Sequence, residues 1–170
     1  MAKALLITRN DIVKKTALGG AVDADKFLQF VEVAQDTDVQ NYLGTDLLEA
    51  IQGYIVAGTI GDAGQAAYLS LLTDYIKPMA LHFAMTHYLP WAAYTISNKG
   101  VYKHTSENAE TVEKNELDFL IEKERDIAEA YAEKFVKYMI YNQATFAEYT
   151  SNSDADVYPD RDVNLTSWYI

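Results

Sequence analysis

Cysteine is absent from this 170-residue chain, and basic residues are few. Without cysteine there can be no disulfide framework, thiolate nucleophile, zinc–thiolate site or iron–sulfur cluster. The 14 Lys and Arg residues stand against 25 Asp and Glu, which gives a formal net charge of -11. This balance argues against a dedicated nucleic-acid binder, whose phosphate contacts need clustered basic side chains, and against binding to an anionic membrane surface.

Long hydrophobic runs are also missing. The longest apolar stretch, 79–94, is interrupted by two histidines, a threonine and a proline, and it is shorter than the ~20 residues of a transmembrane helix. The N-terminus offers only 4–7 as an apolar run, whereas a secretory leader needs about 7–15 residues. We therefore expect a protein that is made and used without crossing a membrane.

Motifs of enzyme chemistry are absent as well. The sequence has no G-x-x-x-x-G-K-[ST] phosphate loop, no G-x-G-x-x-G turn and no G-x-S-x-G elbow. His82 and His87 are five residues apart and diverge on a helix, whereas a zincin needs histidines at i and i+4. We interpret both as core-helix histidines with hydrogen-bond partners. The sequence predicts no catalytic residue, no metal ligand and no cofactor, and therefore no enzyme.

Hydrophobic periodicity predicts helices along the first half of the chain. Thr8 followed by Asp11 is an N-capping pattern for a short helix over 9–15. A second helix, capped at Asp23 and stopped by Gly44, presents one apolar face with Phe27, Phe30, Val31 and Ala34. Another helix starts at Thr45, with an apolar stripe of Leu47, Leu48, Ile51, Tyr54 and Ile55.

A helix that is apolar on nearly every side is predicted to run to about Ser97, in the centre of the fold. Pro78 either opens it in the first turn or kinks a continuous helix, and Pro90 should kink it again. The polar stretch 98–113 is predicted to be an exposed loop.

A long amphipathic helix is predicted from Glu116, with a solvated charged face. Its apolar stripe consists of Leu117, Leu120, Ile121, Ala128, Tyr131, Phe135 and Met139. The expected fold class is all-α, a helical bundle of about five helices with a long C-terminal helix. This helical domain covers 1–149, and an extended C-terminal arm covers 150–170.

The arm is acidic and ends in large apolar residues. An EF-hand loop starting at Asp154 would need glycine at its sixth position and glutamate at its twelfth, where this chain has Pro159 and Leu165. Calcium at an interface in an assembly stays an alternative. Aromatic residues at a free terminus favour a docked state, because Tyr and Trp are enriched at contact cores. We predict a partner interface at Tyr158, Pro159, Trp168, Tyr169 and Ile170.

The order of these elements resembles the head–tail connector (adaptor) proteins of tailed bacteriophages. The likeness rests on ITRNDIVKKT at 7–16, on the Tyr42-Leu43-Gly44 step before a Leu-rich helix, and on the apolar helix YIKPMALHFAMTHYLPWAAY at 75–94. NKGVYKHTSENAE at 98–110, followed by the long helix, is similar to connector-like proteins of Bacteroidetes phages, including crAss-like phages. The resemblance covers roughly 7–149.

The resemblance implies a structural virion protein that forms a ring, often a dodecamer, in the phage neck below the portal. Its partners would be further copies of itself, the portal protein and the next neck or tail ring, since a head-to-tail interface that closes on itself makes a ring. DNA would pass through the lumen without specific binding, because a net acidic lumen repels phosphates. The protein would be made in the host cytoplasm and used in the virion.

Two alternatives stay open. The chain could form a tail-completion or stopper ring at another position in the virion, which the identity of its partner would decide. It could also be a non-viral helical protein-binding module, which predicts a monomer or dimer with a groove. An unrecognised metalloenzyme would require bound metal in the purified protein.

Overall fold

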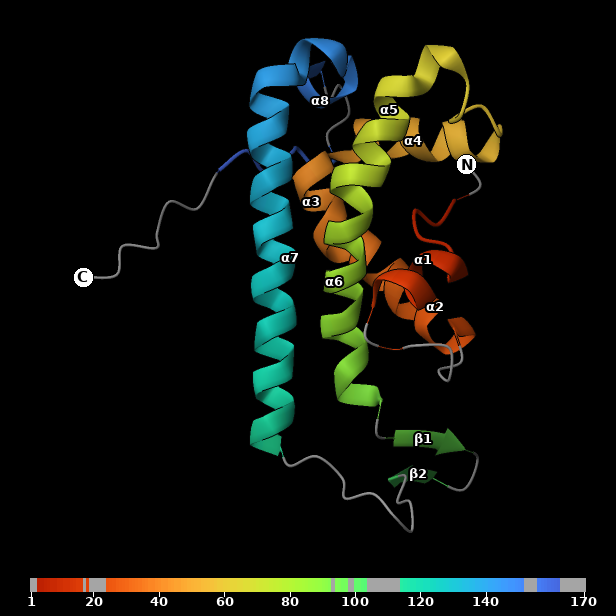
Figure 1. Ribbon diagram of the computed structural model, residues 1–170, viewed down its shortest axis with the longest axis vertical. Coiled ribbons are helices and arrows are strands. Elements are labelled where there is room, and N and C mark those ends of the chain that lie inside the picture. The colour runs from red at the N-terminus through yellow and green to blue at the C-terminus, as the bar shows by residue number, and fades with distance from the viewer. Residues whose placement is uncertain are drawn as a thin grey trace, which may run out of the picture.

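The computed structural model describes residues 3–16, 18, 24–92, 94–97, 100–103, 114–151 and 156–162. It confirms an all-α bundle with a long C-terminal helix (Figure 1). The α-helices of these residues are α1 (Arg9–Lys15), α2 (Ala24–Ala34), α3 (Gln40–Leu43), α4 (Thr45–Val56), α5 (Ala66–Leu71), α6 (Lys77–Tyr88), α7 (Lys114–Asn142) and α8 (Ala147–Ser151). Shorter helical turns are the π turns Gln35–Val39 and Leu72–Ile76 and the 3-10 turns Ala63–Gln65, Leu89–Trp91 and Gln143–Thr145.

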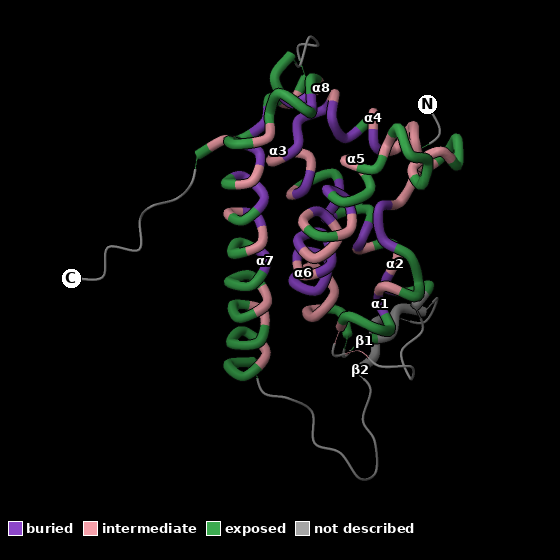
Figure 2. The backbone as a smooth tube through the Cα atoms, turned by 45° about the horizontal axis from the view of Figure 1, so that its top comes forward, coloured by how far each residue is buried: buried purple, intermediate pink, exposed green. Residues whose placement is uncertain are grey.

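The centre of the bundle is α6, which packs against α7 on one side and α2 on the other (Figure 1). Its buried side chains are Met79, Ala80, Leu81, Phe83, Ala84, Met85 and Thr86. Such consecutive positions cover the whole circumference of the helix, so other elements must surround it. Figure 2 shows the buried residues gathered along the facing sides of these helices. The predicted central apolar helix is therefore confirmed.

Pro78 is accommodated by a π turn. In a regular α-helix the proline ring would clash with the carbonyl group four residues earlier, and the missing N–H would leave that carbonyl without a partner. The wider turn over Leu72–Ile76 lies directly before this point, and Pro78 stands in the first turn of α6. As a result α5 and α6 form one continuous helical rod past the proline.

A buried glutamine fixes the N-terminal segment against the bundle. The Gln35 side chain accepts a hydrogen bond from Leu6 N at 3.0 Å and donates one to Ala4 O at 3.2 Å. Gln52 donates to the same carbonyl at 3.1 Å. These bonds satisfy backbone groups that enter the bundle without a strand or helix partner, and they allow Leu6 to be buried.

The predicted central helix is too long at its C-terminal end. The α-helix ends at Tyr88, and Pro90 stands in the following 3-10 turn. The chain then forms an antiparallel hairpin of β1 (Tyr94–Ser97) and β2 (Gly100–Lys103), where we expected helix and loop. Each strand has four residues, which is too short for an alternating pattern to stand out in the sequence. The predicted loop over 104–113 and the cap at Asp23 lie outside the described residues.

The long helix α7 has fully buried side chains only in its second half. Ala128, Phe135 and Met139 of the predicted stripe are buried, but Leu120 is 45% exposed. Ala128 is the first fully buried residue, and in the first half of this 29-residue helix Leu117, Ile121 and Glu124 are only partly buried. Among the described residues, no helix combines the length and hydrophobicity needed to cross a bilayer.

The carboxylate of Asp11 holds α1 against the bundle. Thr8 N donates to Asp11 Oδ2 at 3.0 Å and Asp11 N donates to Thr8 Oγ1 at 3.3 Å, which confirms the predicted capping pattern. Lys77 Nζ donates to the same carboxylate oxygen at 2.8 Å. Burial by itself raises the pKa of Asp11, but the hydrogen bonds from Lys77 and Thr8 outweigh it and hold the pKa below the usual 3.8.

Asp11→Asn should lower the free energy of unfolding by about 1–2 kcal/mol near pH 7, because the cap is weakened and Lys77 loses its charged partner. Since folding lowers the pKa of Asp11, its contribution is complete well above pH 3.8 and is lost as the pH falls through the folded-state value. Urea unfolding of both proteins at neutral pH and below pH 3.8 measures this. A stability difference that does not shrink in acid would contradict this role of Asp11.

Phe27→Ala should lower the free energy of unfolding by about 3–5 kcal/mol, because this ring is fully buried in the core. Phe30 is only half-buried, so Phe30→Ala should cost less. The two rings contact Tyr88 edge-on at similar centroid distances, 5.3 Å and 5.6 Å, so the comparison isolates burial. Equal losses in urea unfolding would mean that α2 is rotated relative to the bundle.

Candidate functional site

The residues of the predicted partner interface have different surroundings. Tyr158 is 57% exposed, whereas Pro159 is buried against its own chain, which the sequence interpretation did not foresee. Trp168, Tyr169 and Ile170 lie outside the described residues. The partner contact at Tyr158 and at these three residues stays a prediction.

The C-terminal segment 156–162 lies along the junction of α3 and α4. Thr45 N donates to Val157 O at 3.0 Å, and Val157 N donates to Thr45 Oγ1 at 3.2 Å. Asp160 N donates to Asn41 O at 2.7 Å. Thr45 begins α4 and Asn41 is in the last turn of α3, so these bonds use backbone groups that helix ends leave unsatisfied. The segment therefore caps one helix at its start and the other at its end.

Gly44 allows the segment to approach this junction closely. Its φ of 75° and ψ of 163° belong to a region that is essentially restricted to glycine. A Cβ atom at this position would lie 2.7 Å from Pro159 Cδ and 2.9 Å from Pro159 Cγ. The glycine that the sequence marks as a helix stop is therefore also the docking point for the C-terminal segment.

Arg161 ties the end of the segment to α8. Its guanidinium group donates to Tyr149 O at 2.8 Å and lies 5.0 Å from the ring centroids of both Tyr149 and Tyr158. Burial raises the pKa of the Tyr149 hydroxyl, and the nearby Arg161 charge opposes that shift. Segment 156–162 thus packs on the helical core by backbone bonds at one end and by stacked side chains at the other.

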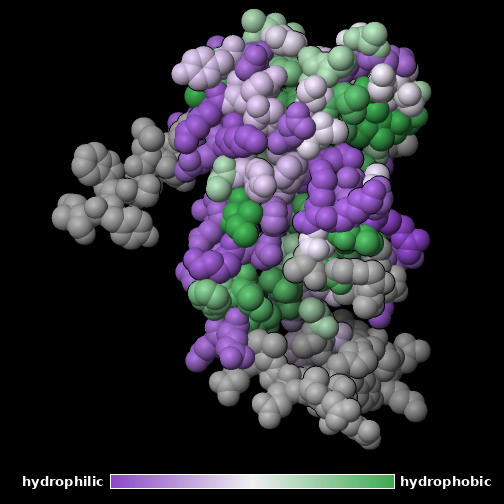
Figure 3. Space-filling view, viewed as in Figure 1, coloured by the Kyte–Doolittle hydropathy of each residue, from purple (hydrophilic) through white to green (hydrophobic). Residues whose placement is uncertain are grey.

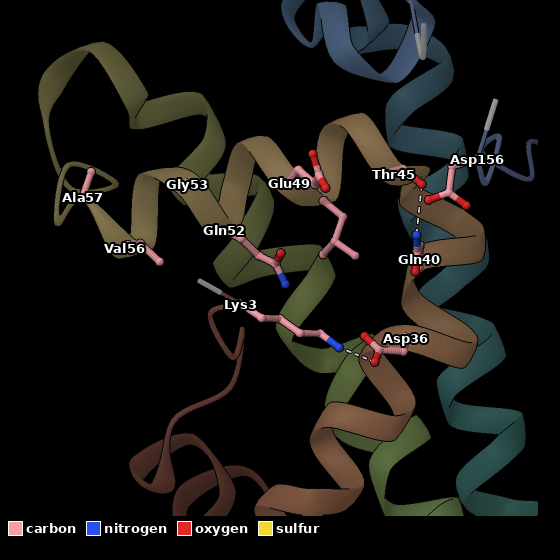
Figure 4. Close-up of a pocket in the computed structure, with 11 residues that line it drawn as sticks. Lys3, Asp36, Gln40, Thr45, Glu49, Gln52, Gly53, Val56, Ala57 and Asp156 are labelled. Carbon is pink, nitrogen blue, oxygen red and sulfur yellow. Dashed lines mark hydrogen bonds and ion pairs between the residues drawn. The ribbon is translucent and has the colours of Figure 1, made fainter. Parts of the chain in front are cut away.

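A groove of about 610 Å³ runs beside this segment and along α4 (Figure 4). Lys3 points across it to pair with Asp36, and this hydrogen bond raises the pKa of Lys3. Glu49 and Asp156 also line the groove, and neither forms an ion pair within the described part of the chain. Among the charged lining residues the carboxylates outnumber the single lysine, so the groove suits a polar or basic side chain better than an anion.

His82 and His87 each have a hydrogen-bond partner, as the sequence predicts, and in both cases the partner is a carboxylate. His82 Nδ1 lies 2.7 Å from Glu124 Oε2, and His87 Nε2 lies 2.8 Å from Asp38 Oδ2. These pairs tie α6 to α7 and to the π turn Gln35–Val39. Within the described residues, no group of three or more His, Asp or Glu side chains is arranged to hold a metal ion. His104 lies outside these residues.

Exposed apolar side chains form further candidate contacts on two sides of the molecule. On the first half of α7, Phe119, Leu120 and Ile127 are 56%, 45% and 40% exposed. Figure 3 shows hydrophobic side chains over the lower part of this helix. On the other side of α6, Val13 of α1 and Val33 of α2 are 43% and 42% exposed. Chemically, these faces can bind another protein surface.

Sequence reasoning missed two kinds of residue in these surfaces. Phe119 and Ile127 could have been found, because their helical phase differs from that of the stripe through Ala128 and Phe135. The contact of Pro159 with Gly44 joins residues far apart in the sequence and leaves no local pattern.

Gly44→Ala should be more destabilising than Gly58→Ala, by at least about 1 kcal/mol. Both glycines have positive φ, 75° and 71°, but a Cβ atom at Gly58 would meet nothing within 4 Å, whereas Pro159 fills that space at Gly44. Urea unfolding of the two variants gives the comparison. Adding Pro159→Ala separates the clash from backbone strain, because it should reduce the cost of the Gly44 variant and leave that of Gly58→Ala unchanged. If Gly44→Ala lowers the free energy of unfolding equally with and without Pro159, the contact between Gly44 and Pro159 does not contribute to stability.

The comparison with protein families gives one match, to a family of unknown function (DUF6712), over residues 39–159. No curated protein and no solved structure matches the chain significantly. The matched range holds both Gly44 and Pro159 and most of the bundle, and it extends beyond the predicted end of the helical domain at 149. Because the match covers well over half of the sequence, the chain belongs to the DUF6712 family.

Proposed function

We propose that this chain is a structural subunit of a ring in the neck of a tailed bacteriophage, where it joins the portal to the tail. The observation that carries the proposal is the exposed apolar face on the first half of α7. This half packs on the bundle through partly buried side chains such as Leu117 and Ile121, but it presents Phe119, Leu120 and Ile127 to the surface. A partner protein would cover this apolar face.

The docked C-terminal segment supports the same proposal. The contact of Pro159 with Gly44 fixes the position of Asp162 near α7, and the sequence continues from there to Trp168, Tyr169 and Ile170. Eight extended residues span at most roughly 26–29 Å, which is enough to reach a neighbouring subunit. The aromatic end then acts as an anchor on the next subunit or the adjoining ring.

The charge of the chain suits a channel for DNA. A ring of subunits that each carry a net charge of -11 repels phosphate groups from its lumen. The genome then passes without specific binding.

A protein-binding module outside a virion is the second candidate, and the groove along α4 favours it. Its volume of about 610 Å³ and the carboxylates of Glu49 and Asp156 in its lining suit a short basic segment of another protein. In that function the chain acts as a monomer or dimer and has no affinity for a portal.

Light scattering of the full chain, alone and mixed with the portal protein encoded in the same genome, tests the proposed function. We expect a closed oligomer or a stoichiometric complex with the portal ring, because the exposed faces are covered only in an assembly. A monomer that does not bind the portal protein would contradict the neck-ring proposal and favour the second candidate.

A shortened chain that ends at Asp162 is the matched control for the aromatic end. It keeps the docked segment and its bonds to Thr45 and Asn41, so it should unfold like the full chain. We expect it to assemble less well, because Trp168 and its neighbours are lost.

A further inference from the structure

We propose that copies of this chain associate head to tail, with α1 of one copy lying on the first half of α7 of the next. The inference rests on the proposed ring and names the contact that builds it. The occupant of the uncovered face of α7 is thus a second copy of the same chain.

Charge complementarity points to this pairing. The seven residues of α1 contain three basic side chains, Arg9, Lys14 and Lys15, against one acidic side chain, Asp11, in a chain that is strongly acidic overall. Lys14 and Lys15 are exposed and form no ion pair within the described part of the chain. Lys14 follows Val13 directly and Arg9 lies one turn before it on the helix surface, so α1 presents an apolar spot with positive charge beside it.

The first half of α7 has the opposite character. Residues 114–127 contain five acidic side chains against three basic ones. Asp118 and Glu122 are exposed and have no ion-pair partner among the described residues, and they lie beside Phe119 on the helix surface. Lys123 also lies near the Phe119 ring, 5.7 Å from its centroid, but acidic side chains outnumber basic ones on this half of α7, so its face complements that of α1.

The positions of the two faces suit a ring. Figures 1 and 2 both show α1 and α7 on opposite sides of α6. A contact between opposite sides of identical subunits is heterologous, so each copy can bind two neighbours, and the chain of contacts closes when the rotation between copies allows. Pairing α7 with α7 would instead bring two acidic faces together and stop at a dimer.

The test uses disulfide crosslinking. Since the natural chain has no cysteine, only the introduced cysteines can form disulfides. The variant Val13→Cys/Phe119→Cys should form a ladder of trimers, tetramers and larger species on mild oxidation. The single variants should give dimers at most. The control Val13→Cys/Ile140→Cys places the second cysteine on the other half of α7, at 51% exposure against 56% for Phe119, and should give no ladder.

Charge reversal gives a second readout that leaves the core untouched. Lys14→Glu/Lys15→Glu should reduce the crosslinking of the Val13–Phe119 cysteine pair at least tenfold. Adding Asp118→Lys/Glu122→Lys should restore it. Restoration requires that the two faces meet, because either pair of substitutions alone leaves like charges opposed.

The outcomes separate this inference from the proposed function. A portal complex without a Val13–Phe119 ladder would overturn the pairing and leave the neck ring standing. A ladder that charge reversal abolishes and restores, without any binding to the portal, would support the pairing and overturn the neck function. Efficient dimerisation of Phe119→Cys alone would overturn head-to-tail association.

Discussion

The fold depends on the contact between Gly44 and Pro159. Gly44 ends one helical rod and starts the next with a backbone conformation that other residues avoid. The same missing side chain leaves the space that the Pro159 ring occupies. Since Thr45 and Asn41 on either side bind segment 156–162 through the backbone, one glycine sets the direction of α4 and the place of this segment. The family match over 39–159 includes both residues of this contact.

Polar side chains fix the positions of the N-terminal segment and of the helices relative to one another, which hydrophobic packing alone would not specify. Gln35 fixes the N-terminal segment, Asp11 fixes α1 through Lys77, and His82 bonds to Glu124 between α6 and α7. An apolar helix such as α6 has no preferred face, so contacts of this kind specify which neighbour lies on which side. Each net hydrogen bond contributes only about 1 kcal/mol, and their main effect is on orientation.

Local patterns in the sequence were sufficient for most helices. The capping pair at Thr8 and Asp11 and the stop at Gly44 are confirmed because each depends on residues within one turn. The hairpin was missed because its strands are short, and the apolar run before Pro90 resembles a helix. The groove along α4 and the docking of Pro159 could not be predicted, because they arise from residues brought together only by the fold.

The first half of α7, which has no fully buried side chain, is helical before a partner arrives. Lys123 pairs with Asp126 at 3.0 Å, and the ammonium group also lies 5.7 Å from the Phe119 ring centroid. Exposed contacts of this kind contribute only a few tenths of a kcal/mol each, so they shape the helix without replacing a packed face. The packing of α7 on α6, together with the His82–Glu124 pair, holds the helix axis in place. The exposed half is therefore preorganised, and binding need not meet the full cost of ordering about four helical turns. A surface that is already ordered but not yet covered is what a subunit requires if it is to add to a growing assembly.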